Sequence, residues 1–152
     1  EWQTDRFFQN ILHEQFNTLA GKTVALLGFA FKQDTGDTRD SPAIPLCEKL
    51  LGEHANVRVH DPKALENAKI DLQEMEGNVR FVEDVYEAVD GVHAIALVTQ
   101  WAEYRELDFE RIYNKMVKPA FIFDGRNHLE HEKLFEIGFN VFPLGKPPLK
   151  HV

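Results

Sequence analysis

The chain has 152 residues, 43% of them apolar, and a formal net charge of −8. This length and apolar content fit one domain with a buried core and argue against a disordered chain. The acidic balance argues against a general binder of nucleic acid or anionic membranes, because both attract clustered Lys and Arg. No apolar run approaches the roughly 18 residues that span a bilayer, and no signal peptide is visible. The single cysteine, Cys47, cannot form an internal disulfide. This is typical of a reducing compartment, so we expect a cytoplasmic protein.

The first predicted element is an amphipathic helix over residues 1–18. Apolar side chains recur along it at helical spacing, namely Phe8, Ile11, Leu12 and Phe16. Its apolar surface, which includes Trp2, Phe7 and Phe8, is expected to be large enough to join a partner. Because the chain opens with Glu1 inside this helix, we expect it to be a piece of a longer protein.

Six strands then alternate with helices. The predicted strands lie at 23–28, 56–61, 79–82, 93–99, 120–125 and 140–145, several of them apolar throughout. One helix is predicted to start at Ser41-Pro42, an N-cap serine followed by a proline in the first helical position. Further helical segments are predicted at 84–90, from 101 onward, at 109–116 and at 130–137, with mixed helical and loop character over 63–78. The proline-containing tail, residues 147–152, is expected to be mobile.

This alternation predicts the fold class. Strands that are apolar throughout indicate a mainly parallel sheet with helices on both faces, and right-handed crossovers make it doubly wound. The prediction is therefore an α/β, Rossmann-like domain with six strands. If the strand order is 3-2-1-4-5-6, ligands bind where the order reverses, beyond the carboxyl ends of the first and fourth strands.

Three cations are expected near that point. Lys32 and Arg39 lie in the loop after the first strand, and Arg126 follows the fifth strand. A lysine is a flexible point charge and an arginine a rigid fork, and both suit phosphate oxygens. The alternative is that Lys32 and Arg126 are surface charges that pair with Asp34 or Asp37.

Other polar residues near the loop have simpler interpretations. The aspartates at 34, 37 and 40 do not have the spacing of an EF-hand, so we expect them to cap turns and pair with Arg39. Asp61 stands where NAD-binding folds place an acid on the ribose, but the first loop has no G-x-G-x-x-G. A turn or helix-capping role for Asp61 explains its position equally well.

Two further groups are considered as metal ligands or nucleophiles. His128 and His131 are three residues apart, but no third ligand with zinc-like spacing accompanies them, so we expect surface histidines. Cys47 falls on the apolar face of its predicted helix and is expected to pack in the core. No catalytic residue is predicted in this chain.

Four motifs, in order, resemble the C-terminal domain of the UDP-glucose 6-dehydrogenases, particularly those of eukaryotes. They are GFAFKQDTGDTRDSPAI, VHDPKA, DGVHAIALVTQWAEYRELDFERI and KPAFIFDGRN. Together they span nearly the whole chain. The resemblance implies a domain that grips UDP-glucose or UDP-glucuronate inside an enzyme that oxidises the former to the latter in two NAD-dependent steps.

The resemblance also implies a division of labour. Residues 1–18 correspond to the end of a central linker helix and residues 19–146 to the UDP-sugar-binding domain. NAD is bound mainly by an N-terminal domain absent from this sequence, as is the motif with the family's catalytic cysteine. The family assembles as dimers or hexamers, so a homo-oligomer is expected of the full-length enzyme.

Site residues are implied position by position. Phe31 and Lys32 match a substrate-contacting pair, Arg126 matches a second substrate residue, and Arg39 matches an arginine that reaches the NAD. Gln33 departs from the pattern, since animal enzymes usually have a second lysine there. The alternatives are a related dehydrogenase acting on GDP-mannose or UDP-N-acetylmannosamine, and a non-catalytic nucleotide-sugar-binding or assembly module.

Overall fold

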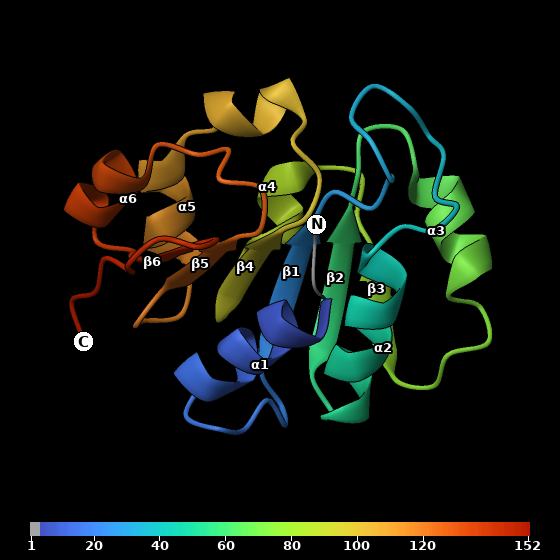
Figure 1. Ribbon diagram of the computed structural model, residues 1–152, viewed down its shortest axis with the longest axis horizontal. Coiled ribbons are helices and arrows are strands. Elements are labelled where there is room, and N and C mark those ends of the chain that lie inside the picture. The colour runs from blue at the N-terminus through green and yellow to red at the C-terminus, as the bar shows by residue number, and fades with distance from the viewer. Residues whose placement is uncertain (1–3) are drawn as a thin grey trace.

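The computed structural model describes residues 4–152, which form one six-stranded sheet (Figure 1). The strands are β1 Thr23–Leu27, β2 Asn56–His60, β3 Asn78–Phe81, β4 Ala94–Leu97, β5 Phe121–Asp124 and β6 Asn140–Pro143. Their order is β3-β2-β1-β4-β5-β6 and every pair is parallel. The predicted Rossmann-like architecture and the reversal between β1 and β4 are confirmed.

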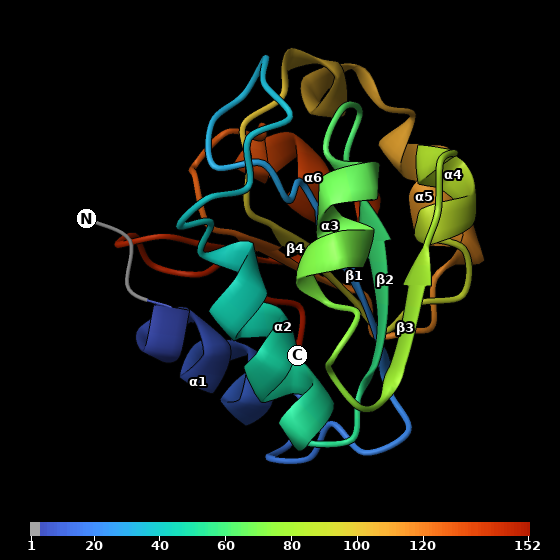
Figure 2. The ribbon, with the colours of Figure 1, turned by 90° about the vertical axis from the view of Figure 1, so that its right-hand side faces the viewer.

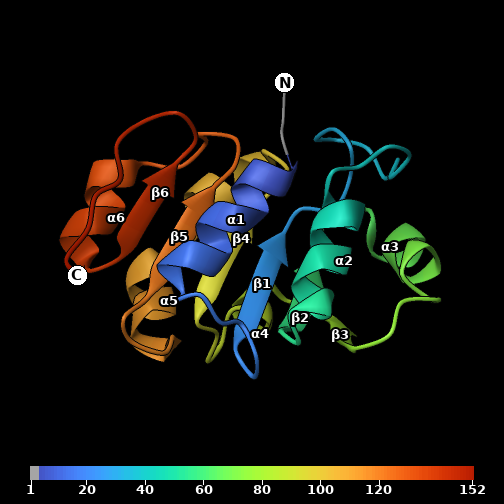
Figure 3. The same cartoon turned by 60° about the horizontal axis from the view of Figure 1, so that its bottom comes forward.

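Helices cover both faces of the sheet. They are α1 Thr4–Glu14, α2 Ala43–Gly52, α3 Leu65–Asp71, α4 Val85–Ala88, α5 Phe109–Lys115 and α6 His131–Ile137, with a 3-10 helix, η1, at Ala102–Glu106. Figures 2 and 3 show α1 and α2 on one face and α4 and α5 on the other. The helix α6 packs against α5 and β6. None of the helices in residues 4–152 has the length and apolar character that a bilayer-spanning segment needs.

The central strands are buried on both faces, which explains their apolar sequences. Residues 24–27 and all of β4 and β5 are buried. Phe121 and Phe123 of β5 stack on each other and on Phe142 of β6, with the Phe123 and Phe142 ring centroids 4.8 Å apart. Each buried aromatic ring removes a large apolar area from water, so this ladder contributes strongly to the core.

The N-terminal helix ends earlier than predicted. It stops at Glu14 rather than 18, because Phe16 and Asn17 adopt left-handed backbone angles (φ 65° and 61°) that reverse the chain. Phe16 is therefore 68% exposed instead of lying on the buried face. Phe7 and Phe8 pack in this chain's own core, which corrects the expectation that they form a surface for a partner. Trp2 lies outside the described residues.

The C-terminal tail is docked, which corrects the prediction of a mobile segment. Leu149 forms an antiparallel bridge with Val141 on the edge strand β6. The His151 ring stacks on Phe135 with centroids 4.0 Å apart, and its backbone N–H donates to Asn140 Oδ1 at 2.7 Å. The tail thus covers part of an exposed sheet edge, where unpaired backbone groups would otherwise face solvent.

Candidate functional site at the carboxyl edge of the sheet

Four strands end in one row. Leu27 of β1 is in register with His60 of β2 and Leu97 of β4, and Leu97 is in register with Asp124 of β5. The loops that follow these strands therefore leave the sheet side by side. This is the edge where open parallel sheets bind their ligands.

Gly28 sets the direction of the loop after β1. Its φ is +98°, and a Cβ at this position would lie 2.5 Å from Thr99 Cβ and 2.6 Å from Thr99 N. Only glycine combines this backbone conformation with so close an approach. The end of β1 is therefore pressed directly against the segment that follows β4.

Asp61 holds the base of the same loop. Its Oδ2 accepts from the backbone N–H groups of Phe29 (2.7 Å) and Ala30 (2.9 Å) and from the indole Nε1 of Trp101 (3.1 Å). Its Oδ1 accepts from Lys63 N (2.8 Å) and Ala64 N (2.9 Å). Asp61 is buried, and five donors occupy both of its oxygens. The turn interpretation is correct, because Asp61 holds residues 63 and 64 while α3 begins later, at Leu65. Asp61 is therefore not available to a ribose.

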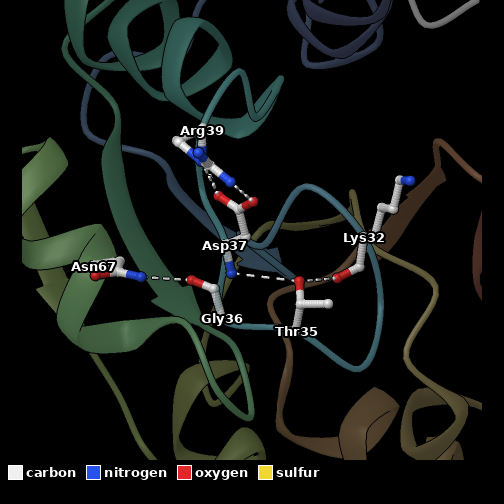
Figure 4. A network of polar contacts seen from close by, with 6 residues as sticks. All are labelled: Lys32, Thr35, Gly36, Asp37, Arg39 and Asn67. Atoms are coloured by element: carbon white, nitrogen blue, oxygen red, sulfur yellow. Dashed lines mark hydrogen bonds and ion pairs between the residues drawn. The ribbon is translucent and has the colours of Figure 1, made fainter.

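The outer part of the loop closes on itself. Phe31 N donates to Asp37 O at 2.7 Å, and Thr35 Oγ1 donates to Lys32 O at 3.1 Å. Asn67 Nδ2 of α3 donates to Gly36 O at 2.6 Å, which ties the loop tip to a neighbouring helix (Figure 4). These hydrogen bonds hold the loop in a defined conformation.

The acidic residues of the loop act in turns, as predicted. Asp34 and Asp40 have φ values of 67° and 59°, a left-handed conformation that aspartate tolerates better than most residues. At the far end, Ser41 Oγ donates to Phe29 O at 2.7 Å and accepts from Ala43 N at 3.1 Å. Ser41 thereby caps the start of α2 from one residue before Pro42, where the backbone turns into the helix.

Arg39 and Asp37 form an exposed ion pair. Arg39 Nε and Nη2 donate to the two Asp37 carboxylate oxygens at 3.0 and 2.9 Å, and the Arg39 side chain is 88% exposed. The hydrogen bond from Arg39 lowers the pKa of Asp37 to about 2. In Figure 4 the Lys32 side chain points away from this pair. The loop therefore does not bring Lys32 and Arg39 together.

Phe31 and Lys32 project from the part of the loop nearest its buried base. Phe31 is 43% exposed, and Lys32 Nζ lies 5.8 Å from the centroid of its ring. Lys32 makes no salt bridge within residues 4–152. Pairing of Lys32 with Asp34 or Asp37, the alternative considered from the sequence, is not what the structure shows.

Arg126 stands on a second fixed loop. Asp124, fully buried at the end of β5, accepts from Arg126 N at 3.1 Å through Oδ1. Its Oδ2 accepts from His128 N and Leu129 N, each at 2.8 Å. The Arg126 side chain reaches back toward β4, with Nε 3.4 Å from Gln100 Oε1. Arg126 is thus positioned from both its backbone and its side chain.

His128 and His131 are part of this support and are not the surface histidines expected. His131 Nε2 lies 2.8 Å from Asp124 Oδ2, and its side chain is only 13% exposed. His128 Nε2 donates to Trp101 O at 2.8 Å. An aspartate that ends an apolar strand is the sequence signal for this role. The residues that complete the support lie in two segments, residues 126–131 and residues 100–101 after β4.

Two other polar side chains near the edge are buried and neutral. Tyr104 Oη lies 2.9 Å from His60 Nδ1, and burial raises the pKa of Tyr104 well above its ordinary value. Burial also lowers the pKa of His60.

Cys47 packs in the core as predicted, and burial raises the pKa of its thiol to about 12. A thiol so protonated and enclosed cannot act as a nucleophile.

The fold, the reversal between β1 and β4 and the cationic loops define a Rossmann-like domain of the nucleotide-binding class. The model of the UDP-glucose/GDP-mannose dehydrogenase family, UDP binding domain, matches residues 25–131. The chain belongs to this family and is its UDP-binding domain.

Similar proteins agree with this assignment. The chain is 44% identical over 97% of its length to UDP-glucose 6-dehydrogenase 5 of Oryza sativa subsp. japonica. It is 42% identical, over the same share, to UDP-glucose 6-dehydrogenase 1 of Arabidopsis thaliana. It spans 34% of the length of each of these relatives.

Solved structures share the fold. A UDP-glucose dehydrogenase from Pyrobaculum islandicum matches 90% of this chain and 30% of its own, with a TM-score of 0.70 and 30% identity. An NDP-N-acetyl-D-galactosaminuronic acid dehydrogenase from Methanosarcina mazei Go1 matches 94% of this chain and 28% of its own, with a TM-score of 0.76 and 26% identity.

Proposed function

We propose that this chain is the UDP-sugar-binding part of an NAD-dependent UDP-glucose 6-dehydrogenase. One observation carries the proposal. Two cation-bearing loops, each anchored by a buried aspartate, flank the switch point in a chain that is 44% identical to a UDP-glucose 6-dehydrogenase. In this proposal residues 1–18 are the end of a linker segment, whose helix stops at Glu14, and residues 19–146 form the UDP-sugar-binding domain. The full-length enzyme is a cytoplasmic homo-oligomer.

The site residues have distinct roles in this proposal. Lys32 and Arg126 bind the diphosphate of UDP-glucose, because charge-assisted hydrogen bonds from cations are the strongest that phosphate oxygens accept. Phe31, exposed beside Lys32, contributes apolar contact area. Arg39, held at the surface by Asp37, is positioned to turn toward a ligand on a neighbouring domain.

In this proposal the described residues, 4–152, do not by themselves form an NAD site. The first loop lacks the three glycines that let a pyrophosphate approach the backbone, and five donors already occupy the oxygens of Asp61. Only Arg39 is assigned to the cofactor here. NAD, bound mainly by other parts of the full-length enzyme, would accept the hydride. This chain alone is therefore expected to turn over no UDP-glucose.

Calorimetric titration with UDP tests the proposed site. Lys32→Ala and Arg126→Ala should each weaken binding by roughly 10- to 100-fold, the loss of one charge-assisted contact. Arg126→Lys should also weaken it, since an ammonium group cannot reproduce the guanidinium fork. Arg39→Ala should change little in this chain, because its proposed partner is absent.

Lys115→Ala is the matched control. Lys115 is an exposed cation at the end of α5, before β5, and so lies toward the opposite edge of the sheet. If Arg126→Ala and Lys115→Ala bind UDP equally well, the nucleotide does not sit at the carboxyl edge. The site assignment would then be wrong.

A further inference from the structure

The short segment after β4, Thr99 to Trp101, contacts both cation-bearing loops. Thr99 Oγ1 donates to Ala30 O at 2.8 Å, two residues before Lys32. Gln100 Oε1 accepts from Arg126 Nε at 3.4 Å. Three consecutive residues therefore include one contact to each loop before the tryptophan is considered.

Trp101 makes the same connection a second time, through buried groups. Its indole N–H donates to Asp61 Oδ2, the oxygen that also accepts the backbone N–H groups of Phe29 and Ala30. Its backbone carbonyl accepts from His128 Nε2, whose own backbone N–H is held by Asp124. An unbroken series of hydrogen bonds thus runs from the base of the Lys32 loop to the base of the Arg126 loop.

The segment is rigid enough to set a distance. Thr99 and Trp101 are 2% and 4% exposed, and the backbone of Thr99 lies against Gly28 too closely to admit a side chain there. Buried hydrogen bonds are costly to leave unmade, so the two loops cannot easily shift relative to each other. The strand β4 lies between β1 and β5 in the sheet, so this segment spans the gap between the two loops (Figure 1).

We infer that Thr99, Gln100 and Trp101 form a positioning bridge, which fixes the separation of Lys32 and Arg126 and thereby selects a nucleoside diphosphate over a monophosphate. The inference rests on the proposed function. A diphosphate gains over a monophosphate when two cations at a fixed separation engage it together. The second contact then forms at a high effective concentration. If the separation becomes variable, each cation still binds a phosphate group, but the advantage of the longer ligand is lost.

The test compares UDP with UMP, titrated by calorimetry into the 152-residue chain. Trp101→Phe keeps an aromatic ring and removes the N–H that bonds Asp61. Tyr86→Phe, the matched control, removes a hydroxyl of α4 that accepts from Asp108 N and contacts neither cation-bearing loop. Trp101→Phe should lower the preference for UDP over UMP by about 5- to 20-fold, the size of a typical coupling between sites. Tyr86→Phe should leave the preference unchanged.

Substitutions of Thr99 give a second, gentler test. Thr99→Val has nearly the same shape without the hydroxyl, and Thr99→Ser retains the hydroxyl. The valine variant should lose part of the UDP preference and the serine variant should keep it. A purely structural role for the bridge predicts that every variant weakens UDP and UMP by the same factor, and that result would overturn the inference.

The outcomes separate the two proposals. If Lys32→Ala and Arg126→Ala lower the UDP preference but Trp101→Phe and Thr99→Val do not, the proposed site stands and the bridge is refuted. If the unmodified chain binds neither nucleotide, or binds both with equal affinity, the selectivity does not exist and the bridge is again refuted. If the unmodified chain binds neither nucleotide, the proposed function of the chain is refuted as well.

Discussion

Asp61 and Asp124 stand at the ends of strands on opposite sides of the switch point, and both are buried carboxylates that accept backbone N–H groups. The two carboxylate oxygens of Asp61 accept hydrogen bonds from five donors, three on Oδ2 and two on Oδ1. Asp124 has one donor on Oδ1 and three contacts on Oδ2, one of them from the imidazole of His131. The two residues do the same structural task, but Asp61 is the more completely enclosed by donors.

This difference teaches how the edge is built. The Lys32 loop is long, and its base depends on one carboxylate that also fixes the start of the segment leading to α3. The Arg126 loop is short, and its carboxylate is shared with a histidine from α6. Beyond these buried bases, the loop tip relies on Asp37 and Arg39, a pair in solvent. Stability should therefore depend most on Asp61, less on Asp124 and least on Asp37.

Asp61→Asn should have the largest effect. Whichever way the amide is turned, its NH2 group faces at least two buried donors, so their hydrogen bonds are lost together with the charge. We expect the free energy of unfolding to fall by about 3–5 kcal/mol. Urea denaturation measures it, with Asp71→Asn, an exposed aspartate at the end of α3, as the control for the loss of charge alone.

Asp124→Asn should cost less, roughly 1–3 kcal/mol. The asparagine can place its NH2 at the Oδ1 position, where it opposes the single donor Arg126 N, and keep its carbonyl toward the Oδ2 donors. The same urea experiment decides the order. A loss equal to or greater than that of Asp61→Asn would show that donor number does not explain the difference between the two sites.

The histidines beside the two carboxylates sharpen the comparison through pH. His131 contacts Asp124 directly, whereas His60, next to Asp61, is buried against Tyr104. Burial lowers the pKa of His60 below its ordinary 6.5, so between the two pKa values the unfolded chain binds the extra proton. The contribution of neutral His60 to the free energy of unfolding is fully present above about pH 6.5. It is lost as the pH falls through the pKa of His60 in the folded chain.

His60→Gln provides the measurement, because glutamine keeps a polar partner for Tyr104 but does not titrate. Thermal unfolding midpoints should fall more steeply for the unmodified chain than for the variant as the buffer is taken from pH 7 toward pH 5. Parallel curves would mean that His60 does not contribute to the acid sensitivity.

Asp37→Asn should have the smallest effect. The pKa of Asp37 is about 2 in the folded chain, so the pair contributes above the ordinary value of 3.8 and its contribution is lost as pH falls toward 2. Both partners are exposed, however, and solvent and salt screen such pairs. At pH 7 we expect no measurable change in the thermal midpoint, and a loss like that of Asp124→Asn would contradict the distinction between loop base and loop tip.

Much of the fold was predictable because burial on both faces leaves a plain mark on a sequence. Residues 24–27 (VALL) and 94–97 (AIAL) are apolar at every position, which is typical of strands in the middle of a parallel sheet. The end of α1 was not predictable in this way. The apolar spacing continues through Phe16, and the helix stops because two residues adopt left-handed angles that their types do not demand.

Some features of the candidate site were likewise predictable from the sequence, and others were not. The sequence by itself determined the strand order's expected reversal, the cations Lys32, Arg39 and Arg126 near it and the family, because these depend on local patterns and on motifs contiguous in the chain. Only the tertiary structure decided that five donors occupy Asp61, that His131 contacts Asp124, and that Thr99 to Trp101 connect the two loops. These contacts join residues up to 69 positions apart. A buried polar atom is satisfied by whichever groups the fold brings beside it, so no local pattern could specify those partners.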